Sequence, residues 1–599
     1  MEETIQATKW RREKRELTGH LYAKIRAVPI VTLISVFIFV TPPLLLLYYV
    51  EAFGVNVIFW DDWVKVSLVQ KAMSGTLSFS DLFVQHNEHR MPFPNLFMSV
   101  IEILTQYNMV AVMIFSWIFL CLTGLLIFYI YRGNSKWNSY PKLLLAFLPV
   151  LLLLFNFRQW ESILWAITFQ IYFMIFCVAA AFLLLEKSTN IDIWFALGLL
   201  FASLASFSFF AGLAVWPVGI FQIAISKRRS GLRQITLWSV ICIGILISYF
   251  WGYVKPEYHP PLDYGLTHPK EAVSYFLAFV GSPMFWDSVT ISEILGFAAV
   301  SIAVLVLAYA YRRKVLRNNC IWLSLILFTA FFSLFATVGR SGFGVEQALC
   351  SRYTPVTFLG GGGVYLLALS TFGKQFGKSK QLIGSGLLVL IIIGIVFACL
   401  LGFYRGWDEG QSLRFSREVG AYVLFTYKMQ SDENIRNYLF EDTRLVRNLA
   451  EFLEKNRFNV FSQTIVDTST LVLTHSDALF ALEAINGEPT PGQNANFTID
   501  SSQHETTTIT GWAVDKQAND VASAVFIVVD DEVRIPVIYG LVRPDVANHF
   551  ENSNFRFSGF MATFSSSKLG AGNHSLSLEI VSRNGYYYYQ NHVVSLVVS

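Results

Sequence analysis

Residues 28–63 read VPIVTLISVFIFVTPPLLLLYYVEAFGVNVIFWDDW, a long apolar run followed by two adjacent carboxylates between tryptophans. The run Val28–Val50 exceeds the roughly 20 apolar residues that cross the hydrocarbon core of a bilayer. It is too long for the core of a signal peptide and lacks a small-residue cleavage site. We therefore predict an uncleaved first membrane span, preceded by a basic cytoplasmic N-terminus over residues 1–27.

The composition of the 599-residue chain agrees with a membrane protein, since 54% of its residues are hydrophobic and only 15% are charged. Typical soluble domains carry about 25% charged residues. The formal net charge of +3 is too small to indicate a nucleic-acid partner. Six cysteines are present, but their spacing matches neither a disulfide framework nor a metal motif. Membrane lipid is the predicted surrounding of most of the chain.

Apolar runs recur along the chain and predict eleven membrane-spanning helices. These are 28–50, 109–131, 143–157, 164–185, 192–209, 211–226, 235–253, 289–311, 320–338, 355–372 and 383–404.

Basic residues gather in five segments between these runs. The segments are the N-terminus, Arg132–Lys142, Lys227–Arg233, Arg312–Arg317 and Lys374–Lys380. Short cytoplasmic loops are enriched in lysine and arginine, and an eleven-span count places all five segments on the cytoplasmic side. The other loops and everything after Phe403 then lie outside.

Composition also divides the chain into domains. Residues 28–404 form the predicted membrane domain, with a first external loop over 51–108. Residues 405–494 are predicted to be a mixed helical segment, in which 434–456 has helical apolar spacing. Residues 495–599 alternate short β-rich runs with turn residues and predict a small all-β sandwich.

The acidic pair Asp61 and Asp62 opens the first external loop. One carboxylate can act as a general base toward an attacking hydroxyl. With His86 and Glu88 the pair also offers ligands for a divalent cation such as Mg²⁺ or Mn²⁺. The alternative for this pair is a solvated turn at a helix end.

The stretch QHNEHR at 85–90 follows in the same loop. His86, Glu88 and His89 can ligate a metal or relay a proton, and Arg90 can pair with a phosphate. The alternative is a hydrated helix cap. The flanking segments 63–73 and 94–107 are predicted to lie along the membrane interface.

Two later loops carry further polar groups. In RQWES (158–162), Gln159 and Glu161 are candidates to bind an acceptor, a metal or a proton, or the loop is an interfacial anchor held by its tryptophans. In GRSGFGVEQALCSRY (339–353), Arg340 and Arg352 beside Tyr353 suit a lipid-linked phosphate, because guanidinium binds phosphate through two parallel hydrogen bonds. The alternative is an ordinary connecting loop. The loop 254–288 contains several ionisable residues without a distinct motif.

Together these motifs resemble the GT-C glycosyltransferases, multi-span enzymes that use polyprenyl-phosphate sugars on the non-cytoplasmic face. The resemblance is carried by FWDDW, QHNEHR, RQWESILW, SFSFFAGLAVWPVG, YFLAFVGSP and GRSGFG…SRY, and it covers roughly residues 20–480. It is closer to bacterial members that decorate surface glycans. The segments GWAVD (511–515) and YGLVRPDVANHF (539–550) resemble a β-domain attached to bacterial cell-surface proteins.

The resemblance implies an inverting, single-displacement sugar transfer in the bacterial cytoplasmic (inner) membrane. The donor is a polyprenyl-phosphate sugar and the acceptor a cell-envelope glycan or glycoprotein, such as O-antigen polysaccharide. Asp61 or Asp62 is implied as base, with Arg340, Arg352, Tyr353 and Arg90 near the donor phosphate. The sandwich, including Tyr586–Tyr589, either holds the acceptor or is a structural cap.

Three other functions fit parts of the sequence. A lipid-linked glycan transporter or flippase requires ionisable residues within several spans, but most spans here lack them. A glycan polymerase or ligase does not require the early acidic loop. A receptor that displays the sandwich does not require the polar cluster at 85–90.

Overall fold

The computed structural model describes residues 29–598 except 136, 138, 227–230, 373–381, 463–470, 475–477, 491–494, 502 and 503. Within these residues, nine helices are long and apolar enough to cross a membrane by length and composition. The nine are Ile30–Phe53, Met109–Asn134, Tyr140–Ile163, Ala166–Lys187, Gly231–Phe250, Val289–Arg312, Leu316–Phe343, Ser351–Phe372 and Gly384–Phe425. The predicted membrane all-α class is thereby confirmed.

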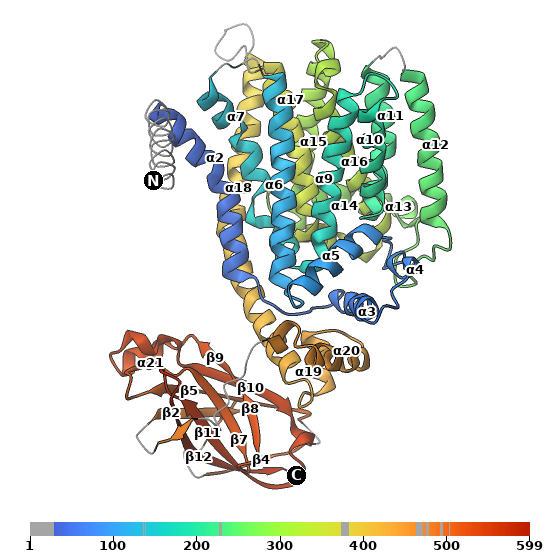
Figure 1. Ribbon diagram of the computed structural model, residues 1–599. Helices are drawn as coiled ribbons and strands as arrows, with labels where there is room; N and C mark the ends of the chain where they lie inside the picture. The colour runs from blue at the N-terminus through green and yellow to red at the C-terminus, as the bar shows by residue number, and fades with distance from the viewer. Residues whose placement is uncertain are drawn as a thin grey trace, which may run out of the picture.

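These long segments contain the following elements in chain order (Figure 1). They are α2 (Ile30–Phe53), α6 (Met109–Asn134), α7 (Tyr140–Leu154), η1 (Phe157–Gln159), α8 (Trp160–Ile163), η2 (Ala166–Thr168), α9 (Phe169–Lys187), α12 (Gly231–Phe250), α15 (Val289–Arg312), η4 (Leu316–Asn319), α16 (Cys320–Arg340), η5 (Ser341–Phe343), η7 (Ser351–Tyr353), α17 (Thr354–Phe372) and α18 (Leu382–Phe425). The short helix η6 (Val345–Leu349) lies between η5 and η7.

The remaining two predicted spans, 192–209 and 211–226, are apolar helices below the length that qualifies the other nine as spans. They correspond to α10 (Ile193–Ser206) and to η3 (Phe210–Ala214) followed by α11 (Val215–Ser226), which lie within the bundle beside the long helices. Their connection is tight, because a Cβ on Gly212 would overlap the carbonyl of Ala205. All eleven predicted segments are therefore helical, and nine of them have spanning length.

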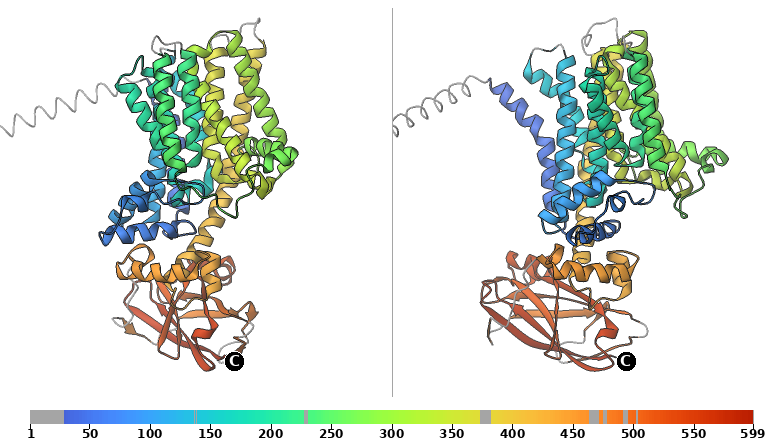
Figure 2. Two further views of the ribbon diagram at one scale, coloured as in Figure 1. Left: turned by 90° about the vertical axis from the view of Figure 1, so that its right-hand side faces the viewer. Right: turned by 45° about the vertical axis from the view of Figure 1, so that its right-hand side comes forward.

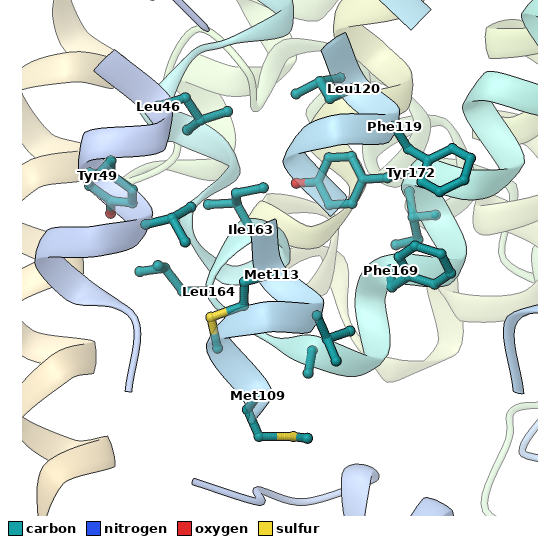
Figure 3. Packing of buried hydrophobic residues seen from close by; sticks show 14 of the residues in the cluster. Leu46, Tyr49, Met109, Met113, Phe119, Leu120, Ile163, Leu164, Phe169 and Tyr172 are labelled. Atoms are coloured by element: carbon teal, nitrogen blue, oxygen red, sulfur yellow. The ribbon is translucent and has the colours of Figure 1, made fainter. Parts of the chain in front are cut away.

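Helix α2 leans away from the bundle at its N-terminal half (Figure 1). It contains Pro42 and Pro43, which remove backbone donors and bend a helix. Its C-terminal half packs into the interior, where Figure 3 shows Leu46 in the same cluster as Met113 of α6 and Tyr172 of α9. Tyr49 is buried and stacks on Phe157 with ring centroids 4.3 Å apart. The first span is thus anchored by its last turns, close to the acidic pair that follows it.

The first loop forms three helices, α3 (Asp62–Met73), α4 (Phe79–Leu82) and α5 (Pro92–Leu104). Helix α5 exposes Leu96, Val100 and Leu104 while it buries Met98 and Ile101. An apolar face left exposed beside membrane spans suits the bilayer interface.

The other polar loops lie at the same end of the bundle as the first loop. Helices α13 (Tyr264–Thr267) and α14 (Pro269–Gly281) belong to the 254–288 loop, and both lie toward the same end of the bundle as α3 to α5 in Figures 1 and 2. The described parts of the basic segments 132–142 and 312–317 lie at the opposite end (Figure 1). The N-terminal 27 residues, 227–230 and 374–380 fall outside the described residues.

Helix α18 continues without interruption from the last predicted span to Phe425, so the boundary predicted at residue 404 lies inside a helix. The amphipathic stretch predicted over 434–456 forms two helices, α19 (Asp432–Tyr438) and α20 (Thr443–Lys455), followed by η10 (Asn459–Ser462). The break arises because Asp442 caps a new helix by accepting a hydrogen bond from the Leu445 N–H at 3.0 Å.

The C-terminal region consists of two sheets, as the sequence predicts. One sheet has the order β1-β12-β11-β7-β8 with β4 beside β12, and the other β3-β2-β5-β10-β9 with β6 beside β5. The first sheet contains β1 (Val472–Leu473), β4 (Ala495–Ile499), β7 (Ala524–Val529), β8 (Val533–Pro536), β11 (Gly572–Val581) and β12 (Tyr587–Val598). The second contains β2 (Leu479–Ile485), β3 (Glu488–Pro489), β5 (Thr506–Asp515), β6 (Asp520–Val521), β9 (Ile538–Leu541) and β10 (Gly559–Ser565), with α21 (Pro544–His549) after β9. Strands β1 to β3 precede the predicted start at residue 495.

The sandwich is attached directly to the end of α18. The Tyr422 hydroxyl and the Gln430 side-chain amide both donate to the Thr563 carbonyl, at 3.2 and 2.6 Å. The Ser565 N–H donates to the Met429 carbonyl at 2.8 Å. These buried contacts hold the sandwich below the end of the bundle that carries the polar loops (Figure 2).

Candidate functional site

A cavity of about 180 Å³ lies at the end of the bundle that carries the polar loops. Its walls come from the first loop, the start of α9, the α10–α11 turn, the 254–268 loop, α16 and η7. The polar lining consists of Asp61, His86, Asn87, Glu88, His89, Thr168, Gln170, Lys255, His259, Arg340, Arg352 and Tyr353. The apolar lining includes Trp165, Phe209, Phe332 and Phe335.

Asp61 lines this cavity and interacts with His86. Its Oδ2 lies 3.3 Å from His86 Nε2. Burial alone would raise the pKa of Asp61, but the hydrogen bond and charge of His86, with Arg352 and Lys65, outweigh burial and lower it. Asp61 is therefore ionised at neutral pH and can accept a proton.

Asp62 points away from the cavity, although it is adjacent in sequence. Its side chain is only 3% exposed, and Oδ2 accepts a hydrogen bond from Trp165 Nε1 at 3.1 Å. Burial, together with the charge of Asp61, raises its pKa to about 7. The two carboxylates thus differ in environment, since Asp61 lines the cavity beside His86 whereas Asp62 is buried against Trp165.

Behind Asp62 lie two further buried ionisable groups, Lys65 and Glu102. Burial lowers the pKa of Lys65 to about 8, and the Lys65 ammonium donates to the side-chain oxygen of Asn95. Burial and the charge of Asp62 raise the pKa of Glu102 to about 8. These groups form a polar core beneath the first loop.

Glu88 forms an ion pair with Arg340 across the cavity. Burial would raise the pKa of Glu88, but His89 and Arg340 outweigh burial and lower it to about 2. His259 Nε2 lies 3.6 Å from the other Glu88 oxygen. The carboxylate therefore fixes the Arg340 guanidinium at the cavity wall.

His89 is held in one orientation by the α10–α11 turn. Its ring stacks on Phe209 with centroids 4.1 Å apart, and Nδ1 accepts a hydrogen bond from the Phe210 N–H at 3.2 Å. Burial lowers its pKa to about 4. His89 is therefore neutral near pH 7, with its proton on Nε2 toward Glu88.

Arg352 is held by Glu161 from the RQWES segment. Its Nε lies 3.3 Å from Glu161 Oε1, and its backbone N–H donates to Glu161 Oε2 at 3.2 Å. Further bonds join the same segments, because Ser162 Oγ donates to the Arg352 carbonyl at 3.1 Å and the Glu161 N–H donates to Ser351 Oγ at 3.1 Å. The segments predicted separately at 158–162 and 351–353 are thus one interlocked unit.

Four sequence candidates lie outside the cavity lining: Asp62 and Glu161, which are described above, and Arg90 and Gln159. The Arg90 guanidinium donates to the carbonyls of Phe83 and Trp251, at 3.0 and 2.7 Å, and so joins the first loop to the end of α12. Gln159 is fully buried and donates to the carbonyls of Leu154 and Asn156 at 2.7 and 2.9 Å. Tyr353, by contrast, lines the cavity, with its hydroxyl accepting a hydrogen bond from Gln347 Nε2 at 2.9 Å.

His259 and Lys255 also line the cavity, although no motif in their loop predicted a role for them. Lys255 Nζ donates to the His259 carbonyl at 2.7 Å. The adjacent Pro260-Pro261 pair, which stiffens the chain, was the available signal that this part of the loop has a fixed conformation.

The four residues predicted as metal ligands do not form a common ligand set. Asp61 pairs with His86, Glu88 pairs with Arg340, and Asp62 accepts from Trp165. Among the described residues, no group of three or more His, Cys, Asp or Glu side chains is arranged to hold a metal ion.

No protein-family model matches the chain. A curated relative from Archaeoglobus fulgidus, described as an uncharacterized protein, is 26% identical over 242 residues. The match covers 36% of this chain, and the chain spans about 60% of the length of that relative.

Among solved structures, ArnT from Cupriavidus metallidurans bound to undecaprenyl phosphate is similar with a TM-score of 0.41 and 13% identity, over 70% of this chain and 88% of that chain. The apo state of ArnT gives a TM-score of 0.38 and 12% identity, over 75% and 92%. An endo-beta-1,4-mannanase from Thermotoga petrophila gives 0.14 and 9%, over 26% of this chain and 24% of that chain. All three TM-scores lie below 0.5, so these similarities assign neither a fold family nor an activity.

Proposed function

We propose that this protein is a membrane glycosyltransferase that transfers a sugar from a polyprenyl-phosphate donor to a glycan or glycoprotein acceptor of the bacterial cell envelope. The observation that carries the proposal is the convergence of Asp61, Arg340 and Arg352 on one cavity. These residues are far apart in sequence and belong to the motifs that resemble GT-C enzymes. They supply a base and two cations, which are the groups that this reaction requires.

The two arginines are suited to an anionic ligand. Each has a carboxylate partner, Glu88 for Arg340 and Glu161 for Arg352, which fixes a long side chain that would otherwise lose rotamer freedom on binding. Both guanidinium groups retain further N–H donors for phosphate oxygens. Phe332, Phe335 and Ala336 of α16 line the same cavity and offer an apolar surface beside the membrane.

The reaction is a single displacement. The acceptor oxygen attacks the anomeric carbon, the bond from that carbon to the phosphate oxygen breaks, and the configuration inverts. Asp61 takes the proton of the acceptor hydroxyl, while Arg340 and Arg352 stabilise the negative charge that grows on the departing polyprenyl phosphate. The donor bond is already activated, so the transfer needs no nucleotide.

The basic segments favour a cytoplasmic N-terminus and an extracytoplasmic cavity and sandwich in the cytoplasmic membrane. A sandwich held beneath the cavity is well situated to bring a glycan acceptor toward Asp61. Tyr586 is 69% exposed and can stack on a sugar ring, whereas Tyr589 is buried and donates to Asp515 at 3.3 Å.

The donor assignment is tested by comparing two lipids on the purified full-length protein by native mass spectrometry, undecaprenyl phosphate and undecaprenol. We expect the wild type to prefer the phosphate. Because each charge-assisted hydrogen bond contributes about 1.5–3 kcal/mol, Arg340→Ala with Arg352→Ala should weaken phosphate binding at least tenfold and leave undecaprenol binding unchanged.

The matched control is Arg444→Ala, which removes an exposed arginine on α20 away from the cavity. This variant should bind undecaprenyl phosphate as the wild type does. Equal binding of the two lipids by the wild type, or an unchanged preference in the double variant, would contradict the donor site.

A further inference from the structure

The helical segment 432–462 contacts both ends of the first loop through one buried residue, Asn459. The Asn459 side-chain amide donates to Asn56 Oδ1 at 2.8 Å and to the Tyr107 carbonyl at 2.8 Å. The Asn459 backbone N–H donates to the Gln106 carbonyl at 2.8 Å. A single asparagine therefore joins the start and the end of a loop more than forty residues long.

Two further hydrogen bonds extend this connection. Asn56 Oδ1 also accepts from the Met109 N–H at 2.9 Å, at the first residue of α6. The Trp60 N–H donates to the carbonyl of Leu439, in the turn between α19 and α20, at 2.8 Å. The residue after Trp60 is Asp61, so the segment 432–462 reaches the backbone directly before the proposed base.

The backbone of the first loop is unusual at these contacts. Trp60, Gln106 and Tyr107 have φ values of 48°, 56° and 61°, a left-handed conformation that is disfavoured for residues with large side chains. Such conformations persist where the surrounding structure enforces them. Here each of the three residues takes part in a hydrogen bond with the segment 432–462.

We propose that Asn459 is a positioning residue for sugar transfer, which holds the first loop in the conformation that aims Asp61 into the cavity. The inference rests on the proposed function and makes the segment 432–462 part of the catalytic unit rather than a linker to the sandwich. The arginines proposed to bind phosphate belong to α16 and η7, whereas the side-chain amide of Asn459 bonds to Asn56 and Tyr107 of the first loop.

The test uses Asn459→Asp in the full-length protein. The substitution replaces a donor by an oxygen that faces two acceptors, Asn56 Oδ1 and the Tyr107 carbonyl. Hydrogen–deuterium exchange should become at least tenfold faster in the first loop, at residues 55–63 and 105–109, and stay unchanged at 339–353. Since a displacement of about 1 Å can lower a rate about 100-fold, sugar transfer in complemented cells should fall by that order while undecaprenyl phosphate binding is retained.

The matched control is Asn456→Ala, which removes an amide that donates only to the Phe452 carbonyl within α20, at 2.8 Å. It should leave exchange and transfer unchanged. Asn56→Asp keeps the accepting oxygen and should also behave as the wild type, whereas Asn56→Ala should reproduce the effect of Asn459→Asp. If Asn459→Asp expresses poorly, Asn459→Ser, which keeps a shorter donor, gives the same comparison.

Unchanged exchange in the first loop of Asn459→Asp, or a loss confined to undecaprenyl phosphate binding, would overturn the positioning role. An equal effect of Asn456→Ala would also overturn it, because the cause would then be general destabilisation of α20. A wild type that neither binds the lipid nor transfers sugar would refute the proposed function instead, and the exchange data would still decide whether Asn459 holds the loop.

Discussion

Each arginine of the cavity has a carboxylate partner, and the two pairs differ in construction. Glu88 reaches Arg340 from the first loop, so this pair joins parts of the chain that are remote in sequence. Glu161 binds both the side chain and the backbone N–H of Arg352. Glu161 therefore fixes both the backbone and the side chain of Arg352, whereas Glu88 fixes only the guanidinium end of the Arg340 side chain.

Buried Glu102 predicts how stability depends on pH. Burial and the charge of Asp62 raise its folded-state pKa to about 8 from 4.5, so folding takes up a proton between these values. Its contribution to stability is fully present below pH 4.5 and is lost as the pH rises through about 8. Asp62, with a pKa of about 7, acts in the same direction.

Lys65 has the opposite effect on the pH dependence of stability, because its pKa is lowered on folding, and this effect occurs at higher pH. Its folded-state pKa is lowered to about 8 from 10.5, so its effect falls above pH 8. Between pH 5 and 8, Glu102→Gln should therefore make the decrease of the unfolding free energy with pH shallower, by up to about 1.4 kcal/mol per pH unit. The melting temperature should accordingly fall less with pH than in the wild type. The measurement is thermal unfolding of the full-length protein in detergent across this range.

Glu441→Gln serves as the control, because Glu441 is exposed and should leave the pH profile unchanged. A Glu102→Gln variant that keeps the wild-type pH profile would show that Glu102 is already ionised in the folded protein.

Residue types predicted much of the site. Asp61, His86, Glu88, His89, Arg340, Arg352 and Tyr353 all line the cavity, and each belongs to a polar stretch in a loop. The direction of a side chain could not be predicted, because it depends on local backbone geometry. Asp61 and Asp62 have the same chemistry, but Asp61 pairs with His86 in the cavity whereas Asp62 is buried against Trp165.

Between elements, α14 and α15 pack in close contact. A Cβ on Gly281 would overlap the Ser292 carbonyl, and one on Gly296 would overlap the Leu277 carbonyl. Small residues permit such close approach of helices in membranes. The contact matters for the site because Tyr275 of α14 donates its hydroxyl hydrogen bond to Gln347, beside Tyr353.

We expect Gly296→Ala to separate these helices and to destabilise the protein by about 1–3 kcal/mol, seen as a lower melting temperature in detergent. The matched control is Gly244→Ala in α12, where a Cβ would meet no atom within 4 Å. Alanine favours the helix by up to about 1 kcal/mol there, so that variant should be unchanged or more stable. Equal melting temperatures for the two variants would contradict the close contact.

Helices were predicted more reliably than their ends. The apolar runs identified the eleven predicted helical segments of the bundle, but α10 ends at Ser206, before the predicted end at residue 209. Similarly, the composition changes from apolar to charged near residue 404, although α18 continues to Phe425. These limits depend on tertiary contacts that apolar periodicity does not contain.

At the scale of the whole molecule, the polar loops and the sandwich gather at one end of the bundle (Figures 1 and 2). The distribution of basic residues predicted this gathering, because each added span reverses the side of the next loop. The two-sheet architecture was predictable from alternating runs, such as the buried and partly buried alternation along β5. The attachment of the sandwich to α18 was not predictable from the sequence. It depends on Tyr422, Gln430 and Thr563, which belong to no recognisable motif.

The most direct test of sugar transfer is mass spectrometry of surface glycans and glycoproteins from cells that lack the gene. The account predicts that one sugar residue disappears and that the wild-type gene restores it. Asp61→Asn should reduce restoration at least 100-fold, whereas Asp62→Asn keeps the acceptor for Trp165 and should restore most of it. Identical glycans with and without the gene, or full restoration by a well-inserted Asp61→Asn variant, would contradict the account.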